Sequence, residues 1–153
     1  GDKDLDLYVV SGSNEYNRDN ALYQDRLYLN DGKGNFTRSM DALPKEVYSG
    51  SCVKAADYDG DGDLDLFVGG KLIPGSYPLS PPSLLLRNDN GKFTNVADGS
   101  LPDHGRLGMV YDAVWQDLDG DKSPELIVVG EWTPITILKN NKGKLENATA
   151  TMV

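Results

Sequence analysis

The chain is poor in the residues that mark disulfide frameworks, catalytic sites and membrane segments. It has one cysteine, so no internal disulfide can form, and Cys52 is expected to be a small side chain packed on a strand. The single histidine, His104, lies in a turn-like segment without a nearby serine or cysteine nucleophile motif. No apolar run approaches the ~20 residues of a transmembrane helix. We therefore expect no enzyme activity and no transmembrane segment in these residues.

Basic side chains are also scarce. Fifteen lysines and arginines stand against 24 acids, which gives the 153-residue chain a net charge of −9. Basic patches are the usual footprint of a nucleic-acid-binding surface, and none interrupts this acidity. The composition argues against a nucleic-acid partner.

What the chain does have is a loop of alternating acids that occurs twice, at residues 57–65 and 117–125. Each loop places acids at positions one, three, five and nine, and the backbone carbonyl of position seven can supply a further oxygen. The predicted metal-site residues are Asp57, Asp59, Asp61, Asp63 and Asp65 in the first loop and Asp117, Asp119, Asp121, Ser123 and Glu125 in the second. Calcium prefers such clusters of hard oxygens, and carboxylates this close repel one another without a counter-ion. A solvated acidic turn is the alternative.

The sequence around the loops excludes an EF-hand. An EF-hand needs a glutamate at loop position twelve and helices on both sides, whereas position twelve here is Val68 or Val128. The residues that follow the acids, 64–68 and 125–129, are short apolar or alternating runs closed by glycine. Such runs predict strands.

The acid loop belongs to a longer repeat. Residues 1–9 match residues 60–68, so Asp2 and Asp6 would be at most half of a calcium site, and we expect a fragment of a longer protein. Strand, turn and strand patterns that are typical of hairpins recur at residues 27–37, 84–94 and 137–145. Further strands are predicted at residues 51–56 and 109–116.

Four strands in each repeat of about 60 residues are typical of a propeller blade. We therefore predict an all-β fold built from β-propeller blades of four antiparallel strands. Residues 1–50 would form a partial first blade, residues 51–108 the second, and residues 109–153 an incomplete third, all within one larger propeller. Closure needs four to eight blades, so either the other blades lie outside these residues or copies assemble around an axis.

The repeat resembles the FG-GAP or VCBS repeat proteins, whose best-known members are the integrin α-subunit propellers. The resemblance rests on residues 57–65 with the following run 66–70, and on the hairpins at residues 27–37, 84–94 and 137–145. Residues 129–135 are similar to a segment of bacterial surface members related to the cartilage acidic protein group. The resemblance implies two structural calcium ions, one held by each loop. Glu125 departs from the family's Asp at position nine, and the integrin landmarks are absent, so integrin-type ligand recognition is not expected.

The connections between strands are the candidate binding surface. Long connections at residues 13–25 and 71–83, and the short one at residues 131–134, should gather on one face. We expect exposed tyrosines there, among them Tyr16 and Tyr23, and with Trp132 they would suit a sugar. Solvated loops or contacts to adjacent domains are the alternative.

Two functions remain open. The first is a calcium-stabilised propeller segment of a secreted or cell-surface protein of bacterial type that binds a protein or a glycan. The second is a non-catalytic accessory part of a larger secreted polysaccharide-active enzyme. Weak calcium sites fill where calcium is millimolar, as it is outside cells, so both functions place the chain in that environment.

Overall fold

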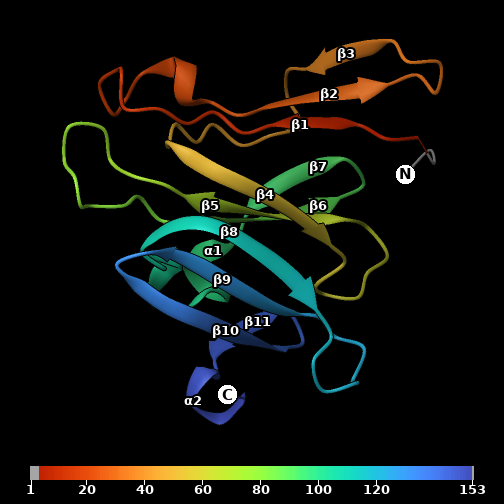
Figure 1. Ribbon diagram of the computed structural model, residues 1–153. Coiled ribbons are helices and arrows are strands. Elements are labelled where there is room, and N and C mark those ends of the chain that lie inside the picture. The colour runs from red at the N-terminus through yellow and green to blue at the C-terminus, as the bar shows by residue number, and fades with distance from the viewer. Residues whose placement is uncertain (1–3, 153) are drawn as a thin grey trace.

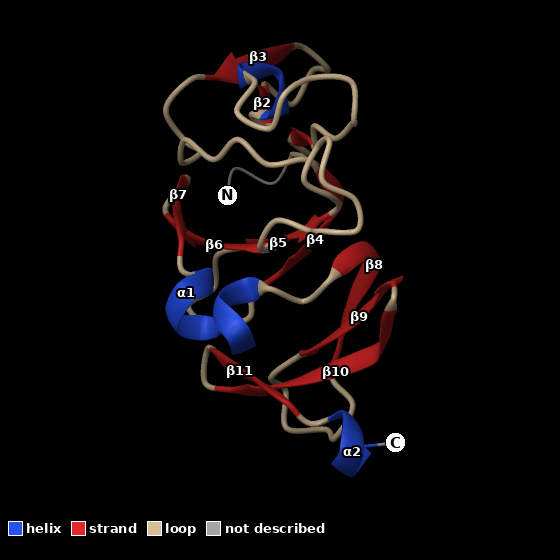
Figure 2. Ribbon diagram, turned by 90° about the vertical axis from the view of Figure 1, so that its left-hand side faces the viewer, coloured by secondary structure: helices blue, strands red, loops and turns tan. Residues whose placement is uncertain are grey.

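Three antiparallel β-sheets follow one another along the chain and stack in sequence order in a computed structural model that describes residues 4–152 (Figures 1 and 2). The first sheet has three strands, and the second and third have four each. The strands are β1 (Leu7–Val9), β2 (Arg26–Asn30) and β3 (Phe36–Ser39) in the first sheet, β4 (Gly50–Ala56), β5 (Asp65–Gly70), β6 (Leu84–Asp89) and β7 (Lys92–Asn95) in the second, and β8 (Met109–Gln116), β9 (Glu125–Glu131), β10 (Thr133–Asn141) and β11 (Lys144–Asn147) in the third.

Each sheet is a meander in which neighbours in sequence pair in space. The expected all-β class is confirmed, as are the strands at residues 51–56 and 109–116 and the three hairpins. Within residues 4–152 the three sheets form an open stack, so they show blade-like units and leave the number of blades in a complete propeller as a prediction. Short helices lie in the connections: η1 (Ala21–Tyr23), α1 (Ala97–Ser100), η2 (Pro102–Gly105) and α2 (Thr149–Met152). None of the helices formed by the described residues has the length and apolar character needed to cross a bilayer.

The core lies between the sheets rather than inside any one of them. Strand β5 is buried along its whole length, because Leu66 and Val68 join a cluster with the first sheet while Phe67 joins a cluster with the third. Alternation along a strand sends successive side chains to opposite faces. Burying one such side chain contributes about 1.5–3 kcal/mol. The central sheet is therefore held from both sides.

The strand pairing fixes how the repeats correspond. Leu66 pairs with Leu86 in the second sheet, as Leu7 pairs with Tyr28 in the first. Tyr28 therefore corresponds to Leu86, whereas the sequence comparison placed Leu29 there, one residue further along. The difference arises because the paired residues Asn30 and Phe36 are six positions apart in the chain, whereas Asn88 and Phe93 are five apart.

The expected exposure of the aromatic side chains is confirmed for Trp132 but not for Tyr23. Trp115 of β8 stacks on Tyr58 of the β4–β5 loop, with ring centroids 6.1 Å apart. Trp132 is 81% exposed, in line with the expected exposed face. Tyr23 was expected to be exposed, and this is wrong: it is 2% exposed and packs edge-on against Tyr16. The η1 turn directs its ring inward, so Tyr23 cannot belong to a sugar-binding face.

Candidate metal centre

The two acid loops occupy the same place in two successive sheets. The first joins β4 to β5 and the second joins β8 to β9, and both lie at the right-hand edge of the stack in Figure 1. In an antiparallel pair, the connecting loop lies where one strand ends and the next begins, so equivalent loops lie at the same end of the strands in each sheet. The repeat therefore places both loops on one side of the molecule.

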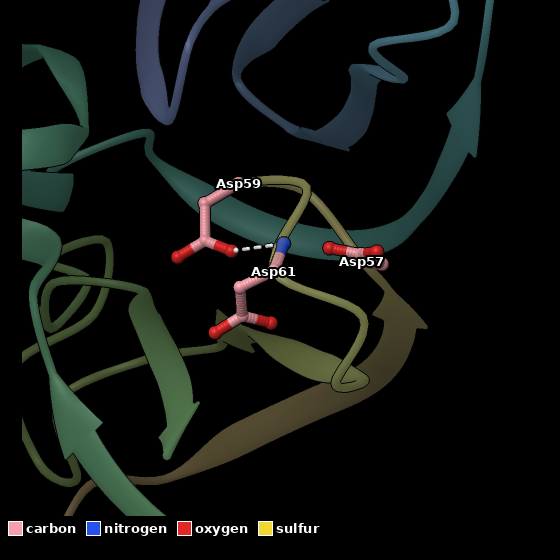
Figure 3. Close-up of side chains that lie close together, drawn as sticks. All are labelled: Asp57, Asp59 and Asp61. Atoms are coloured by element: carbon pink, nitrogen blue, oxygen red, sulfur yellow. Dashed lines mark hydrogen bonds between the residues drawn. The ribbon is translucent and has the colours of Figure 1, made fainter.

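The first loop is folded around its own carboxylates. Asp57 accepts hydrogen bonds from the backbone N–H groups of Gly60 at 2.8 Å and Gly62 at 3.0 Å. The carboxylate of Asp59 accepts from the N–H of Asp61 at 3.3 Å, the bond drawn in Figure 3. These bonds curl the chain so that the acids at positions one, three and five lie beside one another.

The second loop repeats this scheme. Its bonds run from the N–H groups of Gly120 and Lys122 to Asp117 at 2.8 and 3.1 Å, from Asp121 to Asp119 at 3.2 Å, and from Ser123 to Asp121 at 2.7 Å. Two loops with different sequences thus share one backbone path. The repeat is therefore present in the backbone structure as well as in the amino-acid sequence.

Each loop gathers three carboxylate oxygens into a group that could hold a metal ion. The groups are Asp57, Asp59 and Asp61 in the first loop and Asp117, Asp119 and Glu125 in the second, and within each group the oxygens lie within 4.8 Å of one another. Oxygens bound at about 2.4 Å to one calcium ion can be at most about 4.8 Å apart. The all-oxygen donor set and this spacing therefore fit calcium. The structure brings Glu125 into the second group, while Asp65 and Asp121 lie outside these groups.

The acid at position nine clamps its loop to the neighbouring hairpin. The two carboxylate oxygens of Asp65 accept from the N–H groups of Tyr58 at 3.3 Å and Asn88 at 2.7 Å. Glu125 does the same, accepting from Leu118 at 2.9 Å and Asn140 at 3.5 Å. Both carboxylates are almost fully buried, at 1% and 0% exposed. Position nine thus has a structural role that the sequence interpretation as a ligand missed.

An asparagine in the first strand of each hairpin, in β2, β6 and β10, completes this clamp. The side-chain amide of Asn88 donates to the carbonyl of Leu64 at 3.1 Å, and its oxygen accepts from Gly91 at 2.7 Å. The same pair of bonds is made by Asn30 in the first sheet and Asn140 in the third. The recurrence of asparagine in the three hairpins is the signal in the sequence that points to this clamp.

Asn140 also connects the two acid loops. Its side-chain nitrogen donates to the carbonyl of Tyr58 at 2.7 Å, 82 residues earlier in the chain. Because Tyr58 is bonded to Asp65 and Asn140 is bonded to Glu125, an unbroken series of hydrogen bonds joins the loops. The geometry of one loop is therefore mechanically tied to that of the other.

The electrostatics of the first loop favour a bound cation. Burial raises the pKa of Asp65 to about 6, and the neighbouring charges of Asp59 and Asp61 add to the rise. Burial likewise raises the pKa of Asp59, with the Asp61 charge adding to it. Carboxylates that resist ionisation in one another's company are stabilised by a nearby positive charge.

In the second loop a lysine lies among the acids. The ammonium of Lys139 is 2.5 Å from a carboxylate oxygen of Asp119, and this hydrogen bond lowers the pKa of that carboxyl. The residue at the corresponding place in the second sheet, Arg87, pairs with Asp89 instead, at 3.1 Å. Lys139 therefore competes with any metal ion for Asp119, and the second site should be the weaker one.

The remnant of a further acid loop at the start of the chain is only partly described. Asp2 lies outside the described residues. Asp6 accepts from the N–H of Asn30 at 2.9 Å, which is the contact that the acid at position nine makes in the other two sheets. The clamp is therefore present in all three sheets.

Lys122 has a backbone conformation that suits glycine. Its φ is 74°, in the left-handed region, where the first loop has Gly62 at 95°. An L side chain in this region costs about 1–2 kcal/mol. We expect Lys122→Gly to raise the free energy of unfolding by about 1 kcal/mol and the reciprocal change, Gly62→Lys, to lower it by a similar amount. Urea denaturation checks both, and a loss of stability in Lys122→Gly would contradict the equivalence of the loops.

The fold and the loops together define a class of protein: a β-repeat protein whose stacked antiparallel sheets carry acidic, metal-competent loops on one side. Residues 1–68 match the family model of the FG-GAP-like repeat. This match agrees with the resemblance to FG-GAP repeat proteins over residues 1–68. No curated protein and no solved structure gives a significant match.

Proposed function

We propose that the chain is part of a calcium-stabilised β-propeller that acts as a binding module outside cells. The observation that carries the proposal is the pair of acid loops, which hold three carboxylate oxygens each within 4.8 Å in the same hydrogen-bonding scheme. Calcium would be structural, because each loop lies at a sheet edge and is tied to a hairpin by the acid at position nine. The ions would fix the loops, and the opposite side of the sheets would be free to bind.

The exposed face of the first sheet supports further blades of the same kind. Leu7 and Phe36 correspond by strand pairing to side chains that are buried between sheets elsewhere. Leu7 and Phe36 are 47% and 49% exposed, while their counterparts are 9% and 8% exposed (Leu66, Phe93) and 0% and 1% exposed (Leu126, Leu145). Because the equivalent apolar side chains of the second and third sheets are buried against a neighbouring sheet, we expect a further sheet to cover Leu7 and Phe36.

The extracellular location follows from the expected strength of the sites. Calcium sites of extracellular modules bind the ion in the ~10⁻⁴ to 10⁻³ M range, and we expect the same of these loops. Such sites would be filled outside cells and empty in the cytosol. The bacterial source and the alternative role, as an accessory part of a polysaccharide-active enzyme, stay predictions.

Lys139 offers a test of calcium binding at the second site. Replacing Lys139 with methionine removes the ammonium that contacts Asp119 and should strengthen calcium binding there by roughly two- to fivefold, the effect of releasing an exposed ion pair. Lys144→Met is the matched control, because Lys144 pairs with Glu146 and the change in net charge is the same. Calorimetric titration measures both variants. Equal calcium affinities of the second site in the two variants would contradict the competition between Lys139 and calcium for Asp119.

A further inference from the structure

Four side chains from three separate segments meet on the side of the stack opposite the acid loops. Tyr77 lies in the β5–β6 connection, Tyr111 in β8, and Glu131 and Trp132 at the β9–β10 turn. We call these four residues the aromatic cluster. Figure 1 shows the β5–β6 connection and the β9–β10 turn together at the left of the molecule, with the acid loops at the right.

Hydrogen bonds centred on Glu131 hold the cluster together. The hydroxyl of Tyr77 donates to one carboxylate oxygen of Glu131 at 2.7 Å, and the hydroxyl of Tyr111 donates to the other. The indole N–H of Trp132 donates to the hydroxyl oxygen of Tyr77 at 2.8 Å. All three strong side-chain donors of the cluster are therefore used within it.

The backbone departs from regular structure at both points that supply the aromatic rings of the third sheet. Tyr111 is the extra residue of a β-bulge, because its neighbours Val110 and Asp112 pair with the successive residues Gly130 and Val129. Bulges re-aim side chains. Trp132 has a φ of 57°, a left-handed conformation that is costly for a bulky residue.

The blade fold does not require this cluster. At the corresponding positions of the second sheet, Ser51 replaces Tyr111 and Lys71 replaces Glu131, and that sheet forms the same four-stranded meander. A purely structural strut would also be buried, but the three rings stay exposed, at 59% for Tyr77, 54% for Tyr111 and 81% for Trp132. The cluster is a specific addition to the third sheet.

The hydrogen-bonding groups that the cluster leaves unused indicate which class of ligand it can bind. With its donors engaged, the cluster offers carboxylate and phenol lone pairs, aromatic faces and a negative charge. The hydrogen bonds from Tyr111 and Tyr77 also hold the pKa of the Glu131 carboxyl below its usual range. Among the ion pairs of residues 4–152 none involves Glu131. A sugar hydroxyl both donates and accepts hydrogen bonds, so it needs donors that this cluster does not have free. A cation needs only acceptors, negative charge and aromatic faces, which the cluster has.

We propose that the aromatic cluster binds a lysine or arginine side chain of a partner polypeptide, with Glu131 facing the cation and Trp132, Tyr77 and Tyr111 lying against its alkyl stem and charge. The inference rests on the proposed function, because it presumes that the module binds a partner. The net charge of −9 would attract a basic segment. The opposite placement of the cluster and the acid loops leaves calcium binding and partner binding on separate surfaces.

The two indole N–H signals of the protein provide the test, since the chain has two tryptophans. In calcium-containing buffer the ¹⁵N-labelled protein is titrated with the peptide acetyl-Gly-Lys-Gly-Lys-Gly-amide, and with a neutral peptide that carries norleucine in place of both lysines. The Trp132 signal should shift with the lysine peptide alone. The Trp115 signal, from an indole that donates to the carbonyl of Lys54, should stay in place.

Variants and a competing ligand class sharpen the result. Glu131→Gln and Trp132→Ala should each weaken binding by roughly three- to fivefold, as expected for an exposed ion pair and an exposed cation–π contact. Binding in Trp132→Ala is followed from backbone amide signals. Glu146→Gln, an exposed acid on β11 with the same charge change, should leave the affinity unchanged.

Three outcomes would overturn the inference: no shift of Trp132, equal weakening by Glu146→Gln and Glu131→Gln, or a shift with cellohexaose in place of the peptide, which would assign a glycan. Calcium calorimetry on the same sample separates this inference from the proposed function. Calcium binding without a peptide response overturns only the peptide site. A folded sample that binds no calcium overturns the proposed calcium-stabilised module, whatever the peptide does.

Discussion

Replacing Asn140 with alanine should lower the free energy of unfolding by about 3–4 kcal/mol. The side chain is 2% exposed and makes three hydrogen bonds, to the carbonyls of Tyr58 and Pro124 and from the N–H of Gly143. Alanine leaves the carbonyl of Tyr58 without this partner in a buried place, and the carbonyl of Pro124 and the N–H of Gly143 without it in partly buried ones. A buried unsatisfied group costs about 1–3 kcal/mol. The loss is large against the 5–15 kcal/mol stability that is typical of a domain.

The first sheet supplies a matched control for Asn140. Asn30 makes the equivalent bonds to the carbonyl of Leu5 and from the N–H of Gly34, but both bonds lie at the surface. Water can replace its side chain, so Asn30→Ala should cost less than about 1 kcal/mol. Urea denaturation of both variants in calcium-containing buffer measures the difference. Equal losses would mean that the connection between the acid loops contributes nothing to stability.

The double change Asp59→Asn and Asp61→Asn should lower the unfolding midpoint in 10 mM calcium by roughly 5–10 °C. A site with a Kd of about 10⁻⁴ M, at a hundredfold excess of calcium, stabilises the folded state by about 2.7 kcal/mol. For a chain of this size each kcal/mol corresponds to about 2–4 °C. The variant loses two of the three carboxylates of the first group and should lose that stabilisation.

In excess chelator the order of stabilities should reverse. Without calcium the charges of Asp59 and Asp61 repel, which is one cause of the raised pKa of Asp59. The amides remove this repulsion, so the variant should be at least as stable as the wild type. Asp19→Asn with Asp41→Asn, an exposed pair with the same charge change, should behave alike in calcium and in chelator. A calcium-independent loss in the acid-loop variant would point to folding of the loop rather than to metal binding.

Local patterns in the sequence were sufficient to predict the strands and the acid loops. Short apolar or alternating runs closed by glycine predicted β5 and β9, because strands buried on one or both faces carry such runs. The spacing of acids predicted the gathering of Asp57, Asp59 and Asp61, because the loop closes through bonds between near neighbours in the chain.

Contacts between distant residues account for what the sequence did not predict. The role of Asn140 depends on Tyr58, and no local pattern encodes a bond across 82 residues. The burial of Tyr23 depends on how the long first connection folds over the sheets. The aromatic cluster combines Tyr77 with Glu131, 54 residues later, and only their meeting in space shows that the donors satisfy one another.

Calorimetric titration of the chelator-treated protein, with calcium and separately with magnesium, tests the central claim most directly. The account predicts two calcium-binding events, the weaker at the loop that contains Lys139 and Glu125, and little response to magnesium, which demands tighter octahedral geometry. A folded sample that binds no calcium, or that binds magnesium equally well, would contradict the assignment of the acid loops as structural calcium sites.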